Sequence, residues 1–224
     1  MNLKEVVGKK AVEYVKDDMI VGLGTGSTVF YFVQALADRV KEGLNVEMVS
    51  TSIQTVELAK SFGLTIKELE EIDHIDLAVD GVDEIDKDFN AIKGGGAALF
   101  REKIVADIAR EVIWIYDESK DVEKLGNFNL PVEILPFGYS HTIRKMEEAG
   151  LNPVLRLKDG TTLITDNNNY IVDLHLGYGF DIKSVKEKLE SIVGVVEHGL
   201  FLNMCKLCIK GTEDGAVIIE NSNH

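Results

Sequence analysis

The chain has 224 residues, which is long enough for one large domain or two small ones. Its formal net charge of -14 argues against a nucleic-acid-binding protein, because affinity for a phosphate backbone needs a basic face, but it does not exclude a small anionic ligand. No stretch approaches the roughly 20 apolar residues that a membrane span needs, and the N-terminal segment has no apolar block like that of a secretory signal. We therefore expect a cytoplasmic protein.

Strands and helices are predicted to alternate over the first half of the chain. In chain order, apolar periodicity predicts a helix, a strand that ends in glycine, a second helix, a strand, a third helix, two strands, a fourth helix and a buried strand. This alternation is typical of a parallel sheet covered by helices, in which ligands bind beyond the carboxyl ends of the strands. The predicted elements span residues 3–15, 19–24, 29–40, 46–50, 53–63, 65–69, 75–81, 97–110 and 112–116.

The pattern changes after Pro131, where short strands and two amphipathic helices predict a compact α+β unit. The last residues predict a hairpin with its turn around Asp214-Gly215, which we expect to return to the first domain. The predicted division is a sheet domain formed by 1–130 plus 204–224, and a small α+β domain formed by 131–203.

The two cysteines, Cys205 and Cys208, form a single C-x-x-C pair. A zinc site would need about four ligands, and the sequence has no second pair. The segment resembles a strand, in which a spacing of three would direct the two sulfurs to opposite faces. We expect ordinary reduced cysteines.

The stretch "GLGTGSTV" (22–29) follows a predicted strand and opens a helix. Unpaired backbone N–H groups and the helix dipole make such a loop a phosphate site, with Ser27 or Thr28 expected as the N-cap; a plain tight turn is the alternative. A dinucleotide-binding loop would need glycine where Ser27 stands, and a P-loop would need a lysine. A single small phosphate fits best.

The stretch "DGVDEID" (80–86) places Asp80 and Asp83 beside Gly81 at the end of a predicted strand. Two carboxylates there can ligate a metal, act as acid or base, or cap a turn. Magnesium would need further oxygen ligands, and nothing else in the sequence supplies them.

The stretch "IKGGGAALFREKI" (92–104) sets Lys93 before three glycines and Glu102 on the following helix. Glycines let the backbone approach a ligand and present N–H groups to it. The predicted apolar stripe leaves Glu102 on its flank, where partial desolvation would raise the pKa and make a better base. Taken alone, the helix favours a surface glutamate paired with Arg101 or Lys103. All three loops, however, map to one edge of one predicted sheet.

Together with Lys120 in "DESK", "LPVEILP" and "TDNNNYIVDLH", these loops resemble the type A ribose-5-phosphate isomerases in order and spacing over nearly the whole chain. The resemblance implies an α/β fold, a Rossmann-like mostly parallel sheet domain with a smaller inserted α+β domain, in homodimers or homotetramers. It also implies interconversion of D-ribose 5-phosphate and D-ribulose 5-phosphate, in the non-oxidative branch of the pentose phosphate pathway, with no metal and no organic cofactor.

By the same resemblance, Glu102 is the base that carries a proton between C2 and C1 through a cis-enediolate. Lys93 and the glycine amides stabilise the enediolate oxygen, and Asp80 handles hydroxyl protons. The implied substrate-binding residues are Thr25, Gly26, Ser27, Thr28, Asp80, Gly81, Val82, Asp83, Lys93, Gly94, Gly95, Gly96 and Lys120, and Lys4 is a further phosphate contact.

Two other readings remain open from the sequence. The same fold could serve as the sugar-phosphate-sensing domain of a regulator, although such proteins normally carry a helix-turn-helix module. It could also belong to a related amino-sugar phosphate isomerase. Appearance of ketose after addition of ribose 5-phosphate distinguishes the three.

Overall fold

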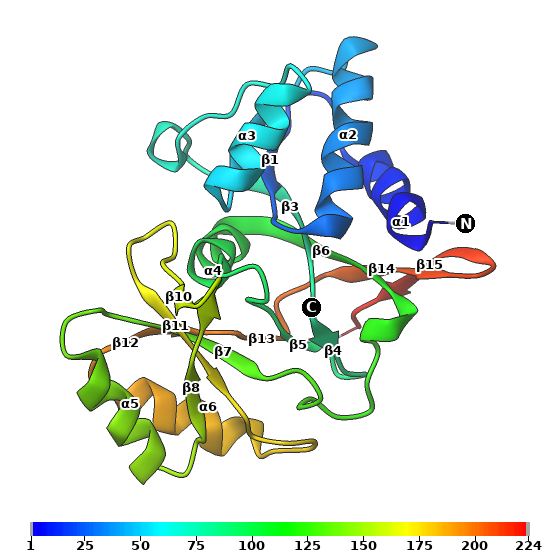
Figure 1. Cartoon of the computed structure of the whole chain (residues 1–224). Helices are drawn as coiled ribbons and strands as arrows, with labels where there is room; N and C mark the ends of the chain where they lie inside the picture. Colours follow the sequence, from blue (N-terminus) through cyan, green and yellow to red (C-terminus); the bar gives the residue numbers. More distant parts are fainter. Residues whose placement is uncertain (1, 223–224) are drawn as a thin grey trace. The chain divides into compact units, whose positions relative to one another are not determined.

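The computed structural model describes residues 2–222, which form two compact units (Figure 1). The first unit comprises 2–82, 101–120 and 203–222; the second comprises 83–100 and 121–202. The predicted boundary near residue 131 stays a prediction. The two compact units differ from the predicted domains in two segments: residues 83–100 and 121–130 belong to the second unit, whereas the prediction placed them in the sheet domain.

The first unit is built on a six-stranded sheet with the order β15-β14-β6-β3-β1-β2. All neighbouring pairs are parallel except β14 with β15, which form the C-terminal hairpin. The predicted return of this hairpin is confirmed, because β14 pairs with β6. The strands are β1 (Ile20–Leu23), β2 (Glu47–Ser50), β3 (Ile75–Gly81), β6 (Ala109–Asp117), β14 (Leu207–Thr212) and β15 (Gly215–Glu220).

Three helices share one apolar core with this sheet, because alternate strand residues point to the same face. Leu23, Leu77 and Ile113 come from the strands, and Phe32 and Leu36 come from α2. The other alternate residues face α4, whose Val105 lies beside Gly22 and Ala78. The three helices are α1 (Leu3–Ala11), α2 (Ser27–Lys41) and α3 (Ile53–Ser61). The helix on the other face is α4 (Leu99–Ile108), which begins in the second unit.

The second unit has its own core, between an antiparallel sheet with the order β12-β7-β11-β8 and two helices. Met146 of one helix and Leu189 of the other pack with Val132 and Val172 of the sheet. These elements are β7 (Leu130–Ile134), α5 (Tyr139–Glu148), β8 (Pro153–Leu155), β11 (Tyr170–Leu174), α6 (Ile182–Ser191) and β12 (Val195–His198).

A small sheet with the order β13-β5-β4 and a hairpin complete the second unit. The sequence did not predict the small sheet, because β4 and β5 have only two and three residues. Its strands are β4 (Glu84–Ile85), β5 (Asn90–Ile92) and β13 (Leu200–Leu202); the hairpin is β9 (Leu157–Lys158) with β10 (Thr161–Thr162).

Two local predictions are wrong. Residues 65–69 form no strand: only the Lys67 N–H reaches the neighbouring β2, at Met48 O, so no ladder forms. The cysteine sulfurs do not point to opposite faces, because Cys205 precedes β14 and strand alternation does not apply to it. The Sγ atoms of Cys205 and Cys208 lie 3.8 Å apart, and both residues are buried.

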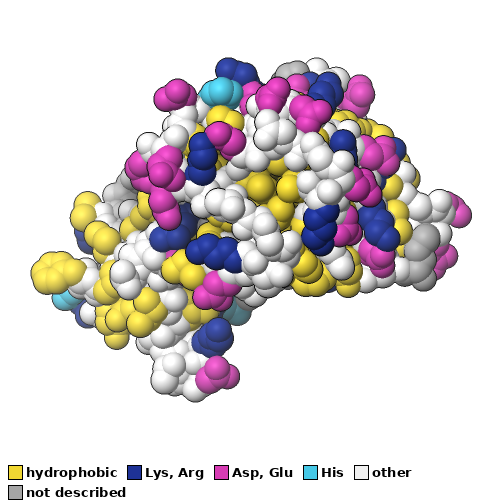
Figure 2. Space-filling model, turned by 90° about the horizontal axis from the view of Figure 1, so that it is seen from above, with side chains coloured by type: hydrophobic (Ala, Val, Ile, Leu, Met, Phe, Trp, Pro, Cys, Tyr) yellow, Lys and Arg dark blue, Asp and Glu magenta, His cyan; other side chains and the backbone are white. Residues whose placement is uncertain are grey.

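Acidic and basic side chains are intermixed over the face of the molecule shown in Figure 2, which carries no continuous basic stripe. Over residues 2–222, no helix has the length and apolar character to cross a membrane.

Candidate active site

The loop between β1 and α2 presents the N-terminus of a 15-residue helix. The helix begins at Ser27 with Gly26 as N-cap and no side-chain capping bond, so the expected capping by Ser27 or Thr28 is wrong. The first backbone N–H groups of α2 therefore remain available to an anion. Lys4 Nζ donates to Ser27 Oγ at 2.9 Å, which adds a positive charge at the same point.

A pocket opens at this helix end within the first unit. Its polar side is made by the glycine loop and Lys4, and its apolar side by residues of α2 and α3. The arrangement suits a dianionic group, because amides, a helix N-terminus and a lysine converge there. The lining residues are Lys4, Gly26, Ser27, Phe30, Tyr31, Gln54, Thr55 and Leu58.

Buried hydroxyl groups hold the β1–α2 loop in place. Thr25 Oγ1 lies 2.8 Å from Thr51 Oγ1 and donates to Ser52 Oγ at 2.7 Å. Thr55 Oγ1 donates to Gly24 O at 2.8 Å, and the Ser52 side chain caps α3. Because its side chain is only 9% exposed and is engaged with these hydroxyls, Thr25 shapes the loop.

Asp80 lies at the end of β3 and orients the same loop from the other side. Its Oδ1 accepts hydrogen bonds from the amides of Thr25 at 3.1 Å and Gly81 at 2.7 Å. Glycine is required at position 24, since an added Cβ would lie 2.1 Å from Asp80 Oδ1. The prediction that the loops after β1 and β3 meet at one sheet edge is confirmed.

Asp80 and Glu102 line one hollow of the first unit, which is too narrow to hold a water molecule. Asp80 is 4% exposed and Glu102 is 5% exposed. Apolar side chains of Val105, Ala106 and Trp114 complete the wall. Two carboxylates with little access to water, at the carboxyl end of a parallel sheet, are suited to proton transfer.

The position of Glu102 on α4 differs from the predicted one. The buried face of this helix contains Glu102 itself, with Leu99, Val105 and Ala106, whereas Ile108 of the predicted stripe is 41% exposed. The expectation that Glu102 lies on a flank, and the alternative of an exposed surface glutamate, are therefore both wrong. The carboxylate occupies a position that a helix normally gives to an apolar residue.

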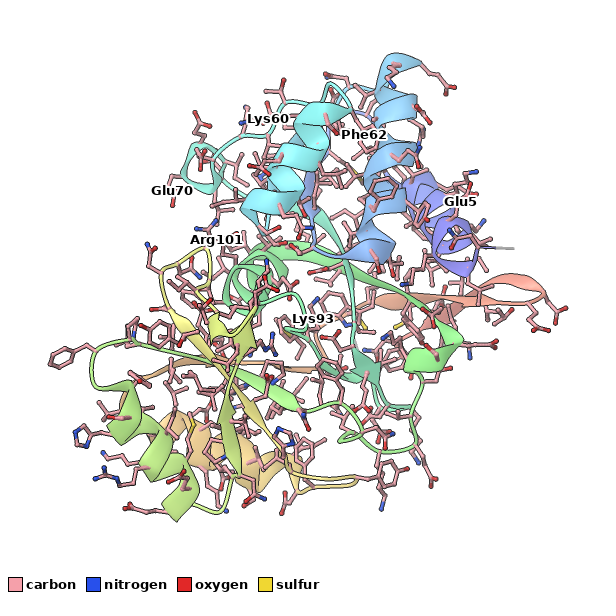
Figure 3. The ribbon with its side chains drawn as sticks, viewed as in Figure 1. Glu5, Lys60, Phe62, Glu70, Lys93 and Arg101 are labelled. Atoms are coloured by element: carbon pink, nitrogen blue, oxygen red, sulfur yellow. The ribbon has the colours of Figure 1, made fainter. Side chains whose placement is uncertain are left out.

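Lys93, labelled in Figure 3, follows β5 in the second unit. It is only 2% exposed. Its Nζ lies 5.3 Å from the centre of the Phe201 ring, within cation–π range. The prediction that this loop leaves the main parallel sheet is wrong, because β5 pairs with β4 and β13 instead. Asp83 also belongs to this unit, and its Oδ2 accepts a hydrogen bond from Gly95 N at 2.7 Å.

The three glycines after Lys93 form a turn in which Gly94 has a backbone conformation that other residues rarely adopt. Gly94 has φ of 108°, and an added Cβ would lie 2.8 Å from Leu99 Cδ2. Gly95 and Gly96 are exposed, so their peptide groups can be reached by a ligand. The Arg156 side chain binds the opposite, carbonyl side of this turn.

The remaining predicted residues lie in the first unit. Gly81 is the last residue of β3, and Val82, which follows it, is buried. Lys120 ends a 3₁₀ turn directly after β6 and is half-buried. Within residues 2–222 no three His, Cys, Asp or Glu side chains are grouped to hold a metal ion.

Sequence reasoning missed the hydroxyl network and Arg156. Thr51 and Ser52 follow β2 at the same sheet edge as the β1 loop, and that placement was the available signal. Arg156 had no local signal, because the glycine turn that it binds lies 62 residues away in the sequence.

Comparisons with known proteins give a consistent result over nearly the whole chain. Residues 47–215 match the family model described as ribose 5-phosphate isomerase A (phosphoriboisomerase A). A ribose-5-phosphate isomerase A from Levilactobacillus brevis is 52% identical over 97% of this chain and 96% of its own length. One from Streptococcus suis is 51% identical over 98% of this chain and 99% of its own length.

Solved structures of similar proteins agree with this. The ribose 5-phosphate isomerase A of Methanocaldococcus jannaschii has a TM-score of 0.91 at 39% identity, with 98% of both chains covered. A D-ribose-5-phosphate isomerase in complex with phospho-erythronic acid has a TM-score of 0.93 at 36% identity, covering 98% of this chain and 100% of the other.

Proposed function

This chain belongs to the ribose 5-phosphate isomerase A family, and from that premise we propose that it interconverts D-ribose 5-phosphate and D-ribulose 5-phosphate. The structural observation that best supports this activity is the placement of Asp80 and Glu102 in one water-poor hollow. An aldose–ketose isomerase must move a proton between two neighbouring carbons, and a desolvated carboxylate is a suitable carrier.

In the proposed mechanism Glu102 removes the C2 proton of the open-chain aldose, forms a cis-enediolate and returns a proton to C1. A proton next to a carbonyl is only weakly acidic, so a carboxylate can remove it only if the negative oxygen is stabilised. We assign that stabilisation to the Lys93 ammonium and to amides of the glycine turn, each such donor contributing a few kcal/mol.

The other roles follow from hydrogen-bonding capacity. Asp80 moves hydroxyl protons, including the one whose transfer opens the sugar ring. The two hydrogen bonds that it accepts from backbone amides fix the orientation of its carboxylate. Asp83 holds sugar hydroxyls with the oxygen that is not bound to Gly95. Gly81 and Val82 line the sugar, and Lys120 contacts it.

We place the phosphate at the start of α2, where the amides of Ser27 and Thr28, with Gly26 and Lys4, would receive it. Thr25 contributes by holding the loop through Thr51 and Ser52.

We also infer a homodimer or homotetramer that works in the cytoplasm, in the non-oxidative branch of the pentose phosphate pathway. The support for these inferences is family membership. Light scattering after size-exclusion chromatography measures the mass of the assembly directly. A mass equal to the 224-residue monomer would contradict the oligomer.

The activity is tested by adding ribose 5-phosphate to the purified protein and following the appearance of ketose. We expect turnover that persists after prolonged EDTA treatment, because the proposed chemistry uses only side chains and backbone amides. Binding of ribose 5-phosphate without turnover would favour a sensing domain. Turnover of an amino-sugar phosphate alone would favour the related isomerase. Loss of activity on chelation, with recovery on adding one divalent ion, would contradict the metal-free mechanism.

A further inference from the structure

We propose that Arg156 is a positioning residue that fixes the direction of the amides in the glycine turn formed by Gly94, Gly95 and Gly96. This inference rests on the proposed function, because it concerns the donors that face the enediolate oxygen. Arg156 itself touches no reacting atom in this account. It acts on the backbone of the turn from the carbonyl side.

The Arg156 guanidinium is divided between a carboxylate and two carbonyl oxygens, all within the second unit. Nε donates to Asp173 Oδ2 at 2.8 Å, and Nη2 pairs with Asp173 Oδ1. Nη1 donates to Gly94 O at 2.8 Å and to Gly95 O at 3.2 Å. The planar, rigid fork of arginine can make these contacts together, whereas the single ammonium of lysine cannot.

These contacts determine where the amides point. In a trans peptide the C=O and N–H groups lie on opposite sides, and the described chain contains no cis peptide bond. Holding Gly94 O therefore directs Gly95 N–H away from Arg156, and there it donates to Asp83 Oδ2 at 2.7 Å. The peptide between these two glycines is thus bound at both ends by side chains of opposite charge.

The same reasoning applies to the next peptide. Holding Gly95 O directs the Gly96 N–H to the side opposite Arg156. Because Asp83 already occupies the Gly95 N–H, the Gly96 N–H is the amide of these two that is left for the enediolate oxygen. Within the described part of the chain the structure assigns this Gly96 amide no partner, and Gly96 is exposed.

A run of glycines needs such a clamp, because glycine populates both signs of φ at little steric cost. The peptide between Gly94 and Gly95 is also held by the Ala97 amide, which donates to Gly94 O at 3.0 Å, and by Asp83. Without Arg156 the next peptide, between Gly95 and Gly96, could rotate and present its carbonyl oxygen where an N–H donor is required. A carbonyl dipole facing a developing oxyanion destabilises it. Arg156 therefore removes unproductive conformations of the turn before substrate binds.

A purely structural ion pair is the simpler explanation of Arg156 and Asp173. Both side chains are mostly buried, at 14% and 19% exposed, so breaking the pair costs stability as well. The pair alone uses only two of the three guanidinium nitrogens, however, and the third is directed at the turn. The experiment must therefore separate turnover from stability.

The first measurement compares steady-state kinetics of three variants. The double variant Arg156→Gln with Asp173→Asn removes both charges and leaves no buried carboxylate alone. We expect its kcat to fall about 100-fold, the scale of a misplaced oxyanion donor, while KM for ribose 5-phosphate changes little. Arg156→Lys should recover part of kcat. Arg110→Gln, which breaks the exposed pair with Asp76, should keep wild-type kinetics.

Inhibition by phospho-erythronic acid tests the same point at equilibrium. Its planar carboxylate resembles the planar, anionic enediolate, so its inhibition constant should rise in parallel with the loss of kcat/KM. All assays are run well below the thermal midpoint of every variant. A folded double variant with wild-type kcat would overturn the proposal. So would a loss that raises KM and leaves inhibition by phospho-erythronic acid unchanged.

The second measurement needs no activity. In protein labelled with ¹⁵N-glycine, the Gly95 amide should exchange slowly with solvent in wild type and in Arg110→Gln, because Asp83 binds it. In the Arg156 variants it should exchange faster, while core amides stay protected. Unchanged exchange would contradict the clamp. If wild type exchanges as expected but turns over no ribose 5-phosphate, the proposed function fails and the clamp stands.

Discussion

The carboxylate of Asp80 fills the space that a side chain at position 24 would need. A Cβ added to Gly24 would lie 2.1 Å from Asp80 Oδ1 and 2.2 Å from its Cγ. The same Oδ1 is held by the Thr25 and Gly81 amides. The absence of a side chain at Gly24 therefore allows the Asp80 carboxylate to occupy its position at the end of β3.

Gly24→Ala should displace either the β1–α2 loop or Asp80, because van der Waals contact requires more than 3 Å. We expect kcat to fall about 100-fold, the usual effect of moving a functional group by about 1 Å. Gly43→Ala is the control for backbone strain alone, since this exposed glycine has φ of 110° and an added Cβ meets nothing within 4 Å. A folded Gly24→Ala enzyme with unchanged kinetics would show that the close contact has no role in activity.

Thr28→Glu should weaken binding of ribose 5-phosphate by about tenfold or more, which corresponds to at least about 1.4 kcal/mol. The substitution puts a negative charge at the helix N-terminus where we place the phosphate dianion. Thr28→Gln is the control, because glutamine has nearly the same size as glutamate but no charge. It should lose less affinity for ribose 5-phosphate than Thr28→Glu. Equal KM values for wild type and Thr28→Glu would move the phosphate elsewhere.

Lys93→Met should lower kcat by about 100-fold with a smaller effect on KM, because its interaction grows as the enediolate forms. Methionine is unbranched and uncharged, and it suits the buried position beside Phe201. Lys87→Met, an exposed lysine of the same unit, is the control. A variant that loses only affinity would show that Lys93 is a phosphate anchor.

The loops of the first unit could be predicted from the sequence because each follows a strand of the parallel sheet. The carboxyl ends of parallel strands lie at the same edge of a sheet, so these loops had to meet there. Glu102 was harder to place. Apolar periodicity treats a glutamate as exposed, whereas α4 buries Glu102 between Leu99 and Val105. The position of Lys93 after β5 depends on pairing with β13, more than a hundred residues later, which no local pattern contains.

Stability should depend on pH through Asp76. Burial raises the pKa of this carboxyl, but the hydrogen bond from Ile20 N and the charges of His74 and Arg110 together hold it below its ordinary value. A lowered folded-state pKa contributes stability above the unfolded-state pKa of about 3.9, and this stability is lost as pH falls through the folded-state value.

Asp76→Asn should therefore be less stable than wild type near neutral pH, and the two stabilities should converge below about pH 4. Urea unfolding of both proteins across the acidic range measures this. A difference that stays constant down to the lowest pH would show that the carboxylate charge is not responsible.

Glu102 is the proposed proton carrier between C2 and C1. Glu102→Gln keeps the shape of the side chain and removes its basicity, so folding should be nearly unchanged. Turnover should fall by about a hundredfold or much more, which is the scale of losing a general base. Asp107→Asn, at an exposed position of the same helix, should behave as wild type.

The most direct measurement follows deuterium from heavy water into C1 of the ketose product. A carboxylate can exchange its proton with solvent before redelivery, so wild type and Asp107→Asn should incorporate the label, and Glu102→Gln should incorporate hardly any. A folded Glu102→Gln enzyme that is saturated by ribose 5-phosphate, turns over near the wild-type rate and still labels C1 would contradict the account. The base would then have to be sought at Asp80, which lines the same hollow.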